Sequence, residues 1–279
     1  MKTAEVSVQD QTLEARLAPS RLLAFRRAAL MLLWTLFMML VNLRSCLGGH
    51  GLPGVETMRW HRVVLKITGI EVQVHGTPIR DRPVMFLPNH VSYLDIPVLG
   101  SLLPCSFVSK AEVRDWPAFG WLAVQQRTIF IKRDPRQAAN QLQEMRERLE
   151  EGGCLVLFPE GTSSDGSRVL PFKSSLLQAS TIEFPETGQI EVQPVSIAYT
   201  RLDGVPMGRA LRPFFAWYGD MELAPHLIDL LGMGSLGVEV VFHDPIRLAD
   251  TGDRKGLARL AWEKTSDGLA DALRGRYQA

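Results

Sequence analysis

Short apolar runs bounded by turn residues recur along most of the chain and predict buried β-strands. Helical stretches lie between them. The clearest is 135–151, where Asp134 is placed as N-cap and Gly152-Gly153 as the C-terminal stop, and residues 254–277 form a final amphipathic helix. Alternation of strands and helices predicts an α/β fold with a mixed, largely parallel sheet covered by helices. The expected strands are 84–87, 107–109, 129–131, 155–158, 195–198 and 238–242.

An uncharged apolar run, residues 28–43, lies near the N-terminus between arginines on both sides. As a helix its sixteen residues span about 24 Å, short of the roughly 30 Å hydrocarbon core of a bilayer. A buried core helix is one interpretation, and a signal peptide ending near Leu43-Arg44-Ser45-Cys46 is another. The flanking charges favour a third, a segment inserted into one leaflet or just spanning the membrane.

Residues 56–70 mix basic, aromatic and apolar side chains, which is typical of a helix lying at a membrane surface. An ordinary surface helix is the alternative, and His61 is interpreted as an interfacial side chain. With the preceding run, this segment predicts a two-helix membrane-dipping motif over residues 21–69. A flexible tail (1–20) then precedes it, and one α/β domain (70–279) follows.

Composition adds a membrane partner to this picture. The 279 residues are 46% hydrophobic, enough for a sizeable core, and three scattered cysteines exclude a disulfide scaffold. The net charge of +1 hides an uneven distribution, because residues 1–66 carry nine basic and four acidic side chains while the remainder is acidic. A basic front suits an anionic leaflet, and nothing in the charge pattern indicates nucleic-acid binding.

Candidate chemistry begins where the first predicted strand ends, at Asn89-His90. Active sites of open α/β sheets gather at the carboxyl ends of strands. His90 and Asp95 can meet only if the chain turns after the strand, since five positions on a helix or strand place them apart. A carboxylate bonded to one imidazole nitrogen leaves the other as a general base. An isolated His-x4-Asp pattern is nevertheless more often a histidine in an ordinary loop.

A second candidate site follows the strand 155–158 in the loop Pro159-Glu160-Gly161-Thr162. Glycine N–H groups and hydroxyls of such a loop can cradle an anion, whereas a plain polar turn is the alternative. Glu160 is unusual beside an anion and is interpreted as ordering the loop or a neighbouring cation. Arg133 and Lys110, at the ends of two further strands, supply cations that suit a phosphate.

One motif matches a dinucleotide-binding pattern but is not interpreted as a binding site. Gly232-Met233-Gly234-Ser235-Leu236-Gly237 satisfies GxGxxG, but it follows a helical stretch and precedes a strand. Dinucleotide binding requires the reverse order, so this segment is predicted to be a turn. No signature of a serine hydrolase, zinc protease or nucleotide triphosphatase occurs, and neither a metal nor a cofactor is expected.

The succession of these blocks resembles the glycerolipid acyltransferase family, which includes the bacterial 1-acylglycerol-3-phosphate (lysophospholipid) acyltransferases. The resemblance covers roughly residues 55–245. It rests on the NHxSxxD block at 89–95 and the FPEGT block at 158–162, with Arg133 between them and Pro194-Val195 after them. It implies that His90 is the base, Asp95 its partner, and Lys110, Arg133, Glu160, Gly161 and Thr162 the acceptor-binding group.

The resemblance also implies a reaction and a location. A fatty acyl group moves from acyl-acyl carrier protein or acyl-coenzyme A, as cosubstrate, to the free hydroxyl of a lysolipid. The expected acceptor is 1-acyl-sn-glycerol-3-phosphate, giving phosphatidate. The block Phe215–Met221 resembles a subgroup containing lyso-ornithine lipid O-acyltransferases, which is the alternative acceptor. The expected location is the bacterial inner membrane with the catalytic domain facing the cytoplasm. Rival hypotheses are a silent protein that binds lysolipid or acyl carrier, and a thioesterase.

Overall fold

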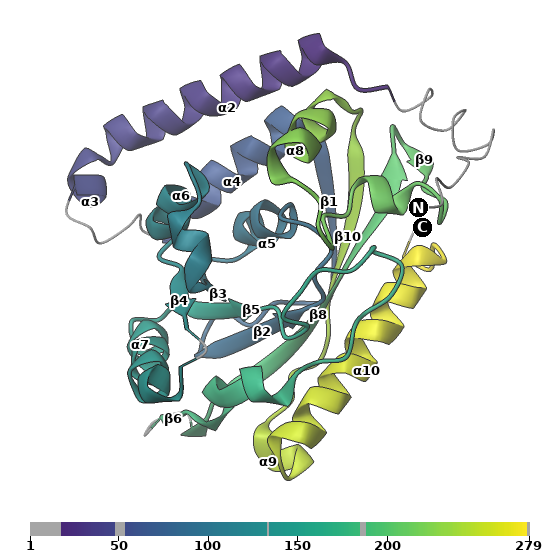
Figure 1. The fold of residues 1–279 in the computed structure, drawn as a ribbon. Coiled ribbons are helices and arrows are strands. Elements are labelled where there is room, and N and C mark those ends of the chain that lie inside the picture. Colours follow the sequence, from purple (N-terminus) through teal and green to yellow (C-terminus); the bar gives the residue numbers. More distant parts are fainter. Residues whose placement is uncertain (1–17, 48–53, 133, 185–187, 278–279) are drawn as a thin grey trace, which may run out of the picture.

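An eight-stranded sheet forms the centre of the computed structural model, which describes residues 18–47, 54–132, 134–184 and 188–277 (Figure 1). The strand order across the sheet is β1-β10-β8-β2-β5-β3-β4, with β9 paired to β8 outside this path. The strands are β1 (Ile70–His75), β2 (Val84–Pro88), β3 (Cys105–Lys110), β4 (Ile129–Ile131), β5 (Cys154–Leu157), β8 (Glu191–Leu202), β9 (Val205–Pro206) and β10 (Leu236–Phe242). A separate pair joins β6 (Glu183–Phe184) and β7 (Gly188–Gln189).

The strand directions confirm the predicted mixed, largely parallel sheet. Strands β8, β2, β5, β3 and β4 run parallel to one another. Strand β10 is antiparallel to β8, and β1 is parallel to β10. All residues of β2 and β5 are buried, as expected for strands with helices on both faces. The carboxyl ends of β2, β5, β3 and β4 therefore meet at one edge of the sheet.

Two large apolar clusters, one on each face, form most of the core, and a smaller third cluster lies beside the last helix. On one face the buried residues of β2, β5 and β8 pack against helices α4 (Gly54–Thr68), α5 (Asp95–Leu102) and α8 (Leu223–Gly232). On the other face they pack against α7 (Ala138–Glu150) and α10 (Arg254–Leu273). The shorter helices are α3 (Leu43–Leu47), α6 (Phe119–Gln125) and α9 (Leu248–Thr251), with 3-10 turns at Ala111–Asp115, Pro135–Gln137, Ser174–Thr181 and Arg212–Phe214.

Helix α2 (Arg21–Val41) lies outermost, across α4 and α8 (Figure 1). It begins earlier than the apolar run, at an N-cap where the Ser20 hydroxyl accepts the Leu23 N–H. The buried Arg27 guanidinium donates to the carbonyls of Leu231 and Met233 at the carboxyl end of α8, at 3.1 and 2.6 Å. Most of the apolar side chains of α2 remain exposed, and α2 is the one described helix long and apolar enough to cross a membrane.

Helix α4 corrects the interpretation of His61. The predicted surface segment 56–70 is helical only to Thr68, and Ile70 begins β1. His61 is 3% exposed and lies against α5 and α6, where its Nε2 is 2.7 Å from the Gln126 Oε1. Burial lowers the pKa of His61 to about 4, so the ring is neutral and belongs to the core. Basic residues of α4 remain on its outer side, where Arg59 is exposed.

Several element boundaries differ from the prediction. The helix expected at 135–151 starts as a 3-10 turn, in which Asp134 Oδ1 accepts the Arg136 N–H, and becomes α-helical at Ala138. The last helix ends at Leu273 rather than at residue 277, where Gly275 adopts a left-handed conformation with φ 76°. The GxGxxG segment connects α8 to β10 as predicted, so helix precedes strand.

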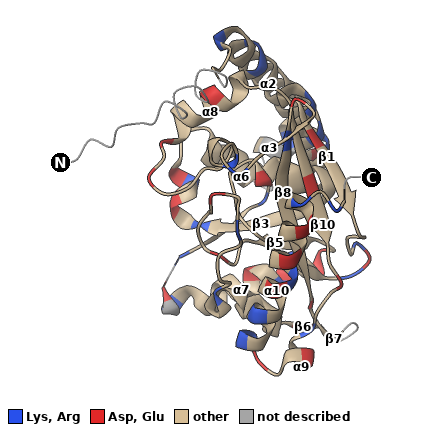
Figure 2. Cartoon of the chain, turned by 90° about the vertical axis from the view of Figure 1, so that its right-hand side faces the viewer, with Lys and Arg blue, Asp and Glu red and all other residues tan. Residues whose placement is uncertain are grey.

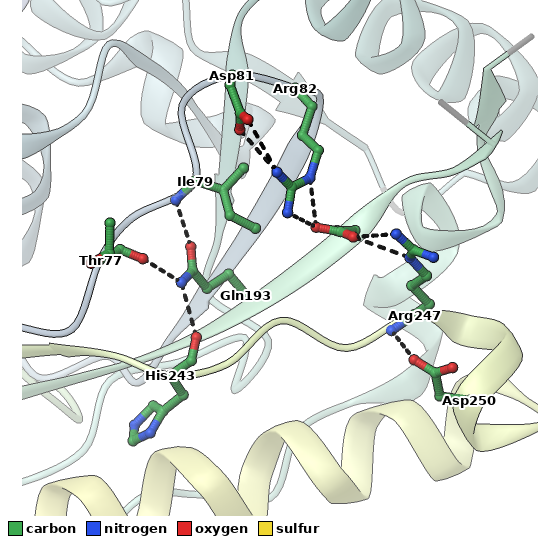
Figure 3. Close-up of polar contacts among 9 residues, drawn as sticks. Thr77, Ile79, Asp81, Arg82, Gln193, His243, Arg247 and Asp250 are labelled. Carbon is green, nitrogen blue, oxygen red and sulfur yellow. Dashed lines mark hydrogen bonds and ion pairs between the residues drawn. The ribbon is translucent and has the colours of Figure 1, made fainter. Parts of the chain in front are cut away.

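A polar network fastens the β1–β2 connection to β8 at the edge of the sheet opposite the carboxyl end of β2 (Figure 3). The Gln193 side chain accepts the Ile79 N–H and donates to the carbonyls of Thr77 and His243. The Glu191 carboxylate accepts from Arg82 on one oxygen and from Arg247 on the other. These contacts fix the amino end of β8.

Candidate active site

The His90–Asp95 pair forms immediately after β2, where the chain turns. Asn89 makes this turn possible, because its side chain donates to the Ile197 carbonyl at 3.0 Å and accepts the Ile197 N–H at 2.7 Å. The neighbouring strand β8 therefore holds the end of β2. Asp95 is the first residue of α5, and its Oδ2 lies 2.8 Å from the His90 Nδ1. The predicted turn is confirmed, and it brings the two side chains together.

The surroundings of Asp95 keep it an acceptor for the imidazole. The carboxylate is fully buried, and Oδ2 also accepts the backbone N–H groups of Val91 and Ser92 at 2.7 and 3.1 Å. With the His90 Nδ1 held by this oxygen, the proton of the neutral ring is placed on Nδ1. Nε2 is then left as the proton acceptor. The His90 side chain is 22% exposed, so substrate can reach it.

Phe158 supports the histidine ring from the second loop. Its ring stacks on His90 with centroids 4.0 Å apart, and Phe107 on β3 stacks in turn on Phe158. The Ser164 N–H donates to the His90 carbonyl at 2.9 Å. The loops after β2 and β5 therefore form one unit at the carboxyl edge of the sheet.

Glu160 also links the loops after β2 and β5. One of its oxygens accepts the His90 N–H at 2.7 Å and the other accepts the Leu170 N–H at 2.9 Å. The residue is 1% exposed, and burial raises the pKa of Glu160 to about 8; the two N–H donors and Lys173 oppose this rise. These contacts agree with the interpretation that Glu160 orders the loop.

The other predicted acceptor-binding residues lie around this centre. Gly161 adopts a left-handed conformation with φ 67°, which favours glycine. A Cβ at this position would lie 3.0 Å from the Lys173 Nζ, so only glycine leaves room for the lysine at this turn. Thr162 is exposed, and Lys110 is exposed at the carboxyl end of β3. Arg133 lies outside the described residues. The acceptor-binding roles of these residues stay predictions.

Sequence reasoning missed contacts that come from distant strands and loops. Tyr199 on β8 donates to the Asp95 Oδ1 at 2.8 Å. Trp217 lies within the block Phe215–Met221. Its backbone N–H donates to the Val91 carbonyl at 3.0 Å, and its backbone carbonyl accepts from the Ser163 hydroxyl. Its ring lies at edge-on and tilted angles to Trp116 and Tyr93. The block Phe215–Met221 was visible as unusual in the sequence, whereas nothing local distinguishes Tyr199.

Comparison with known proteins agrees with this geometry. The acyltransferase family profile matches residues 71–198. A lyso-ornithine lipid O-acyltransferase of Brucella abortus is 44% identical over 220 residues, which cover 78% of this chain and 82% of that protein. The chain belongs to the acyltransferase family. A 1-acyl-sn-glycerol-3-phosphate acyltransferase of Neisseria meningitidis is 31% identical over 239 residues, covering 83% and 88%.

The fold of this acyltransferase has a counterpart of known structure. The crystal structure of the 1-acyl-sn-glycerophosphate acyltransferase PlsC from Thermotoga maritima aligns with a TM-score of 0.51 and 23% sequence identity. The alignment covers 88% of this chain and 97% of that one. This likeness confirms the predicted fold class. The family profile and the relatives confirm the predicted enzyme class, an O-acyltransferase of lipid biosynthesis. Among the described residues, no cluster of His, Cys, Asp and Glu could hold a metal ion.

Proposed function

We propose that this acyltransferase moves a fatty acyl group from a thioester to the hydroxyl of a lyso-ornithine lipid. The observation that carries the reaction is the His90–Asp95 pair, in which a buried carboxylate holds Nδ1 and leaves Nε2 of a partly exposed ring available. The acceptor is supported by the relatives, because those named lyso-ornithine lipid O-acyltransferases match at up to 44% identity. Those named 1-acyl-sn-glycerol-3-phosphate acyltransferases match at 31–33%, and lysophosphatidate is the second candidate.

The reaction follows from the position of Nε2. The acceptor hydroxyl attacks the thioester carbonyl while His90 Nε2 takes its proton, forming a C–O bond and a tetrahedral intermediate. Collapse of the intermediate breaks the C–S bond, and the thiolate leaves with the proton from His90. Asp95 stabilises the imidazolium that forms between the two steps. General-base help of this kind contributes about 10²- to 10⁴-fold to the rate.

Binding of the two substrates uses the edge around this pair. Lys110, Arg133 and the Gly161-Thr162 turn bind the anionic part of the acceptor. Glu160 keeps the loop that contains Gly161 and Thr162 in register with His90. The acyl donor, acyl carrier protein or coenzyme A thioester, arrives from water. No further cofactor is needed, because the acceptor hydroxyl is itself the nucleophile.

The apolar side of α2 supports a position of the enzyme at a membrane. Its exposed side chains include Phe25, Leu33 and Phe37 at 74%, 63% and 54% exposure. A lysolipid that diffuses within one leaflet then reaches the site without leaving the membrane. We place the enzyme on the cytoplasmic side of the bacterial inner membrane, where the acyl donors are made.

The test is an assay with purified protein in lipid vesicles. Labelled acyl-acyl carrier protein and acyl-coenzyme A are offered with lyso-ornithine lipid or lysophosphatidate, and labelled diacyl product is measured. We expect product chiefly from lyso-ornithine lipid, and a loss of about 10²- to 10⁴-fold in the His90→Ala variant.

A matched control is available in His75. Its Nε2 lies 2.6 Å from the buried Glu239 carboxylate and its side chain is 24% exposed, much like His90, but it lies on the edge strand β1. His75→Ala should retain acyl transfer. Equal transfer by wild type and His90→Ala would overturn the proposal. Free fatty acid formed without dependence on acceptor would show a thioesterase, and product chiefly from lysophosphatidate would assign the second candidate acceptor.

A further inference from the structure

The second oxygen of Asp95 is held from the opposite side of the pair. Oδ2 faces His90, Val91 and Ser92, whereas Oδ1 accepts the Tyr199 hydroxyl at 2.8 Å. Asp95 is fully buried and Tyr199 is 3% exposed, so this hydrogen bond is shielded from water. An unpaired carboxylate oxygen in such a site is costly, which makes the contact energetically significant.

Strand β8 contacts both ends of the loop that carries His90, through two residues that lie two positions apart. The backbone N–H and carbonyl of Ile197 pair with the Asn89 side chain at the end of β2. The side chain of Tyr199 reaches Asp95 at the start of α5. One strand therefore fixes both ends of the turn that carries His90.

The Tyr199 hydroxyl is a donor throughout the working pH range. Burial raises the pKa of Tyr199 well above its ordinary value, and the nearby Asp95 charge raises it further. The phenol therefore stays protonated, and its proton points to Oδ1 because Asp95 is the acceptor.

We propose that Tyr199 is a positioning residue for the catalytic pair, which aims Asp95 at His90 and weakens the affinity of the pair for a proton. The inference rests on the proposed role of His90 as general base. A donor to the carboxylate stabilises the state in which the pair has lost its proton. Removing that donor makes the pair take up its proton at higher pH, so less of the base is available near neutrality.

Other ionisable groups near Asp95 define the background of this effect. Glu160, in the loop after β5, lies near enough to Asp95 for the two charges to interact, and Lys173 lies beside Glu160. Tyr93, two residues before Asp95, contributes to the surroundings of Tyr199, but its hydroxyl lies 2.9 Å from the His226 Nδ1 on α8. The Tyr199→Phe substitution leaves Glu160, Lys173, Tyr93 and His226 in place.

The experiment measures kcat/KM against pH from 5.5 to 9.5 for wild type, Tyr199→Phe and Tyr93→Phe. The acid limb of the Tyr199→Phe profile is expected to move to higher pH by about one unit, since a hydrogen bond to a charged group is lost. The activity deficit should then be about tenfold larger at pH 6 than at pH 9. Tyr93→Phe removes a hydroxyl in the same region without touching Asp95, and its acid limb should not move.

A second variant tests the same idea without removing the side chain. 3-Fluorotyrosine at position 199 is a stronger donor of nearly the same size, so the acid limb should move slightly to lower pH. Histidine-selective ¹⁵N labelling follows the same titration directly, with the His90 resonance identified by its loss in His90→Ala.

Two results would overturn the inference. One is a uniform loss of activity in Tyr199→Phe with an unmoved acid limb, which would show a purely structural role. The other is an equal movement in Tyr93→Phe, which would show a general effect of lost hydroxyls. Failure of the proposed function is distinct, because His90→Ala would then transfer acyl groups as the wild type does.

Discussion

At the scale of single residues, two buried acidic side chains from different segments hold the loop that carries His90, and they face different groups. Asp95 faces the imidazole of His90, whereas Glu160 faces the backbone N–H groups of His90 and Leu170. The first holds the orientation of the ring, and the second holds the position of the chain that carries it. Both are needed because the reacting nitrogen must stay within about an ångström of its productive position.

Glu160→Gln separates these roles. A glutamine keeps the shape but replaces one acceptor oxygen by an N–H₂ group facing a backbone N–H, so one of the two loop contacts is lost. We expect kcat to fall roughly 10- to 100-fold with a smaller change in the acceptor KM, because the ring is displaced rather than removed. Steady-state kinetics checks this. The exposed Glu144→Gln on α7 is the matched control and should behave as wild type; a raised acceptor KM with unchanged kcat would instead favour direct acceptor binding by Glu160.

At the scale of elements, strand β8 runs from the polar network at the amino ends of the parallel strands to the active site at their carboxyl ends. Its amino end carries Glu191, held by Arg82 and Arg247 (Figure 3), and its later residues reach Asn89 and Asp95. The strand is buried for ten of its twelve residues. A contact at Glu191 therefore contributes to the frame that positions the active site, without touching the site itself.

Acid should weaken this fastening. Burial acts to raise the pKa of Glu191 in the folded protein. The hydrogen bonds from Arg247 and Arg82 outweigh burial and lower this pKa. A lowered pKa contributes stability above the ordinary carboxyl pKa of about 4.5, and this stability is lost as the pH falls through the folded value. At pH 7, Glu191→Gln should lower the unfolding temperature by roughly 3–8 °C, and the difference from wild type should shrink towards pH 3.

Thermal unfolding monitored across this pH range is the measurement. Glu71→Gln, at an exposed position of β1, controls for the loss of one carboxylate. A difference that stays constant from pH 7 to pH 3 would contradict the ionic origin of the stabilisation.

At the scale of the whole molecule, an apolar helix lies on the outside of a polar body, and the charges of the protein nearly cancel. Charges of both signs are mixed over the body in Figure 2, while α2 presents apolar side chains outward. Polar contacts hold this helix on the body: Arg27 caps α8, Arg21 pairs with Asp229, and Thr35 accepts the Trp60 indole N–H. When α2 binds a membrane, these contacts therefore give the active-site edge a defined orientation relative to that membrane.

Membrane binding should depend on the exposed side of α2. Leu32 and Leu36 are 60% and 51% exposed, and burying each in lipid is worth about 1.5–3 kcal/mol. The Leu32→Glu/Leu36→Glu variant should float with anionic liposomes at least tenfold less than wild type. Asn140→Glu/Gln143→Glu adds the same charge on α7, far from α2 in Figure 1, and should float as wild type does. Equal flotation of both variants would contradict a membrane role for α2.

Features that depend on local chemistry could be predicted from the sequence. Buried strands such as β2 and β5 were predicted to within a few residues, because a parallel strand covered on both faces must be continuously apolar. The two reactive loops were found because their motifs directly follow such strands. The joining of His90 to Asp95 was also predictable, since a turn after the strand is the one geometry that lets them meet.

Which distant residues complete the site depends on how the strands and helices pack together. Tyr199 is 104 residues from Asp95 and Asn89 is 108 residues from Ile197, yet β8 lies beside β2 in the sheet. Likewise, His61 is buried by α5 and α6 rather than exposed at a lipid surface. Periodicity reports which face of an element is apolar, but strand order and helix docking decide what that face meets, because these depend on packing between segments far apart in the chain.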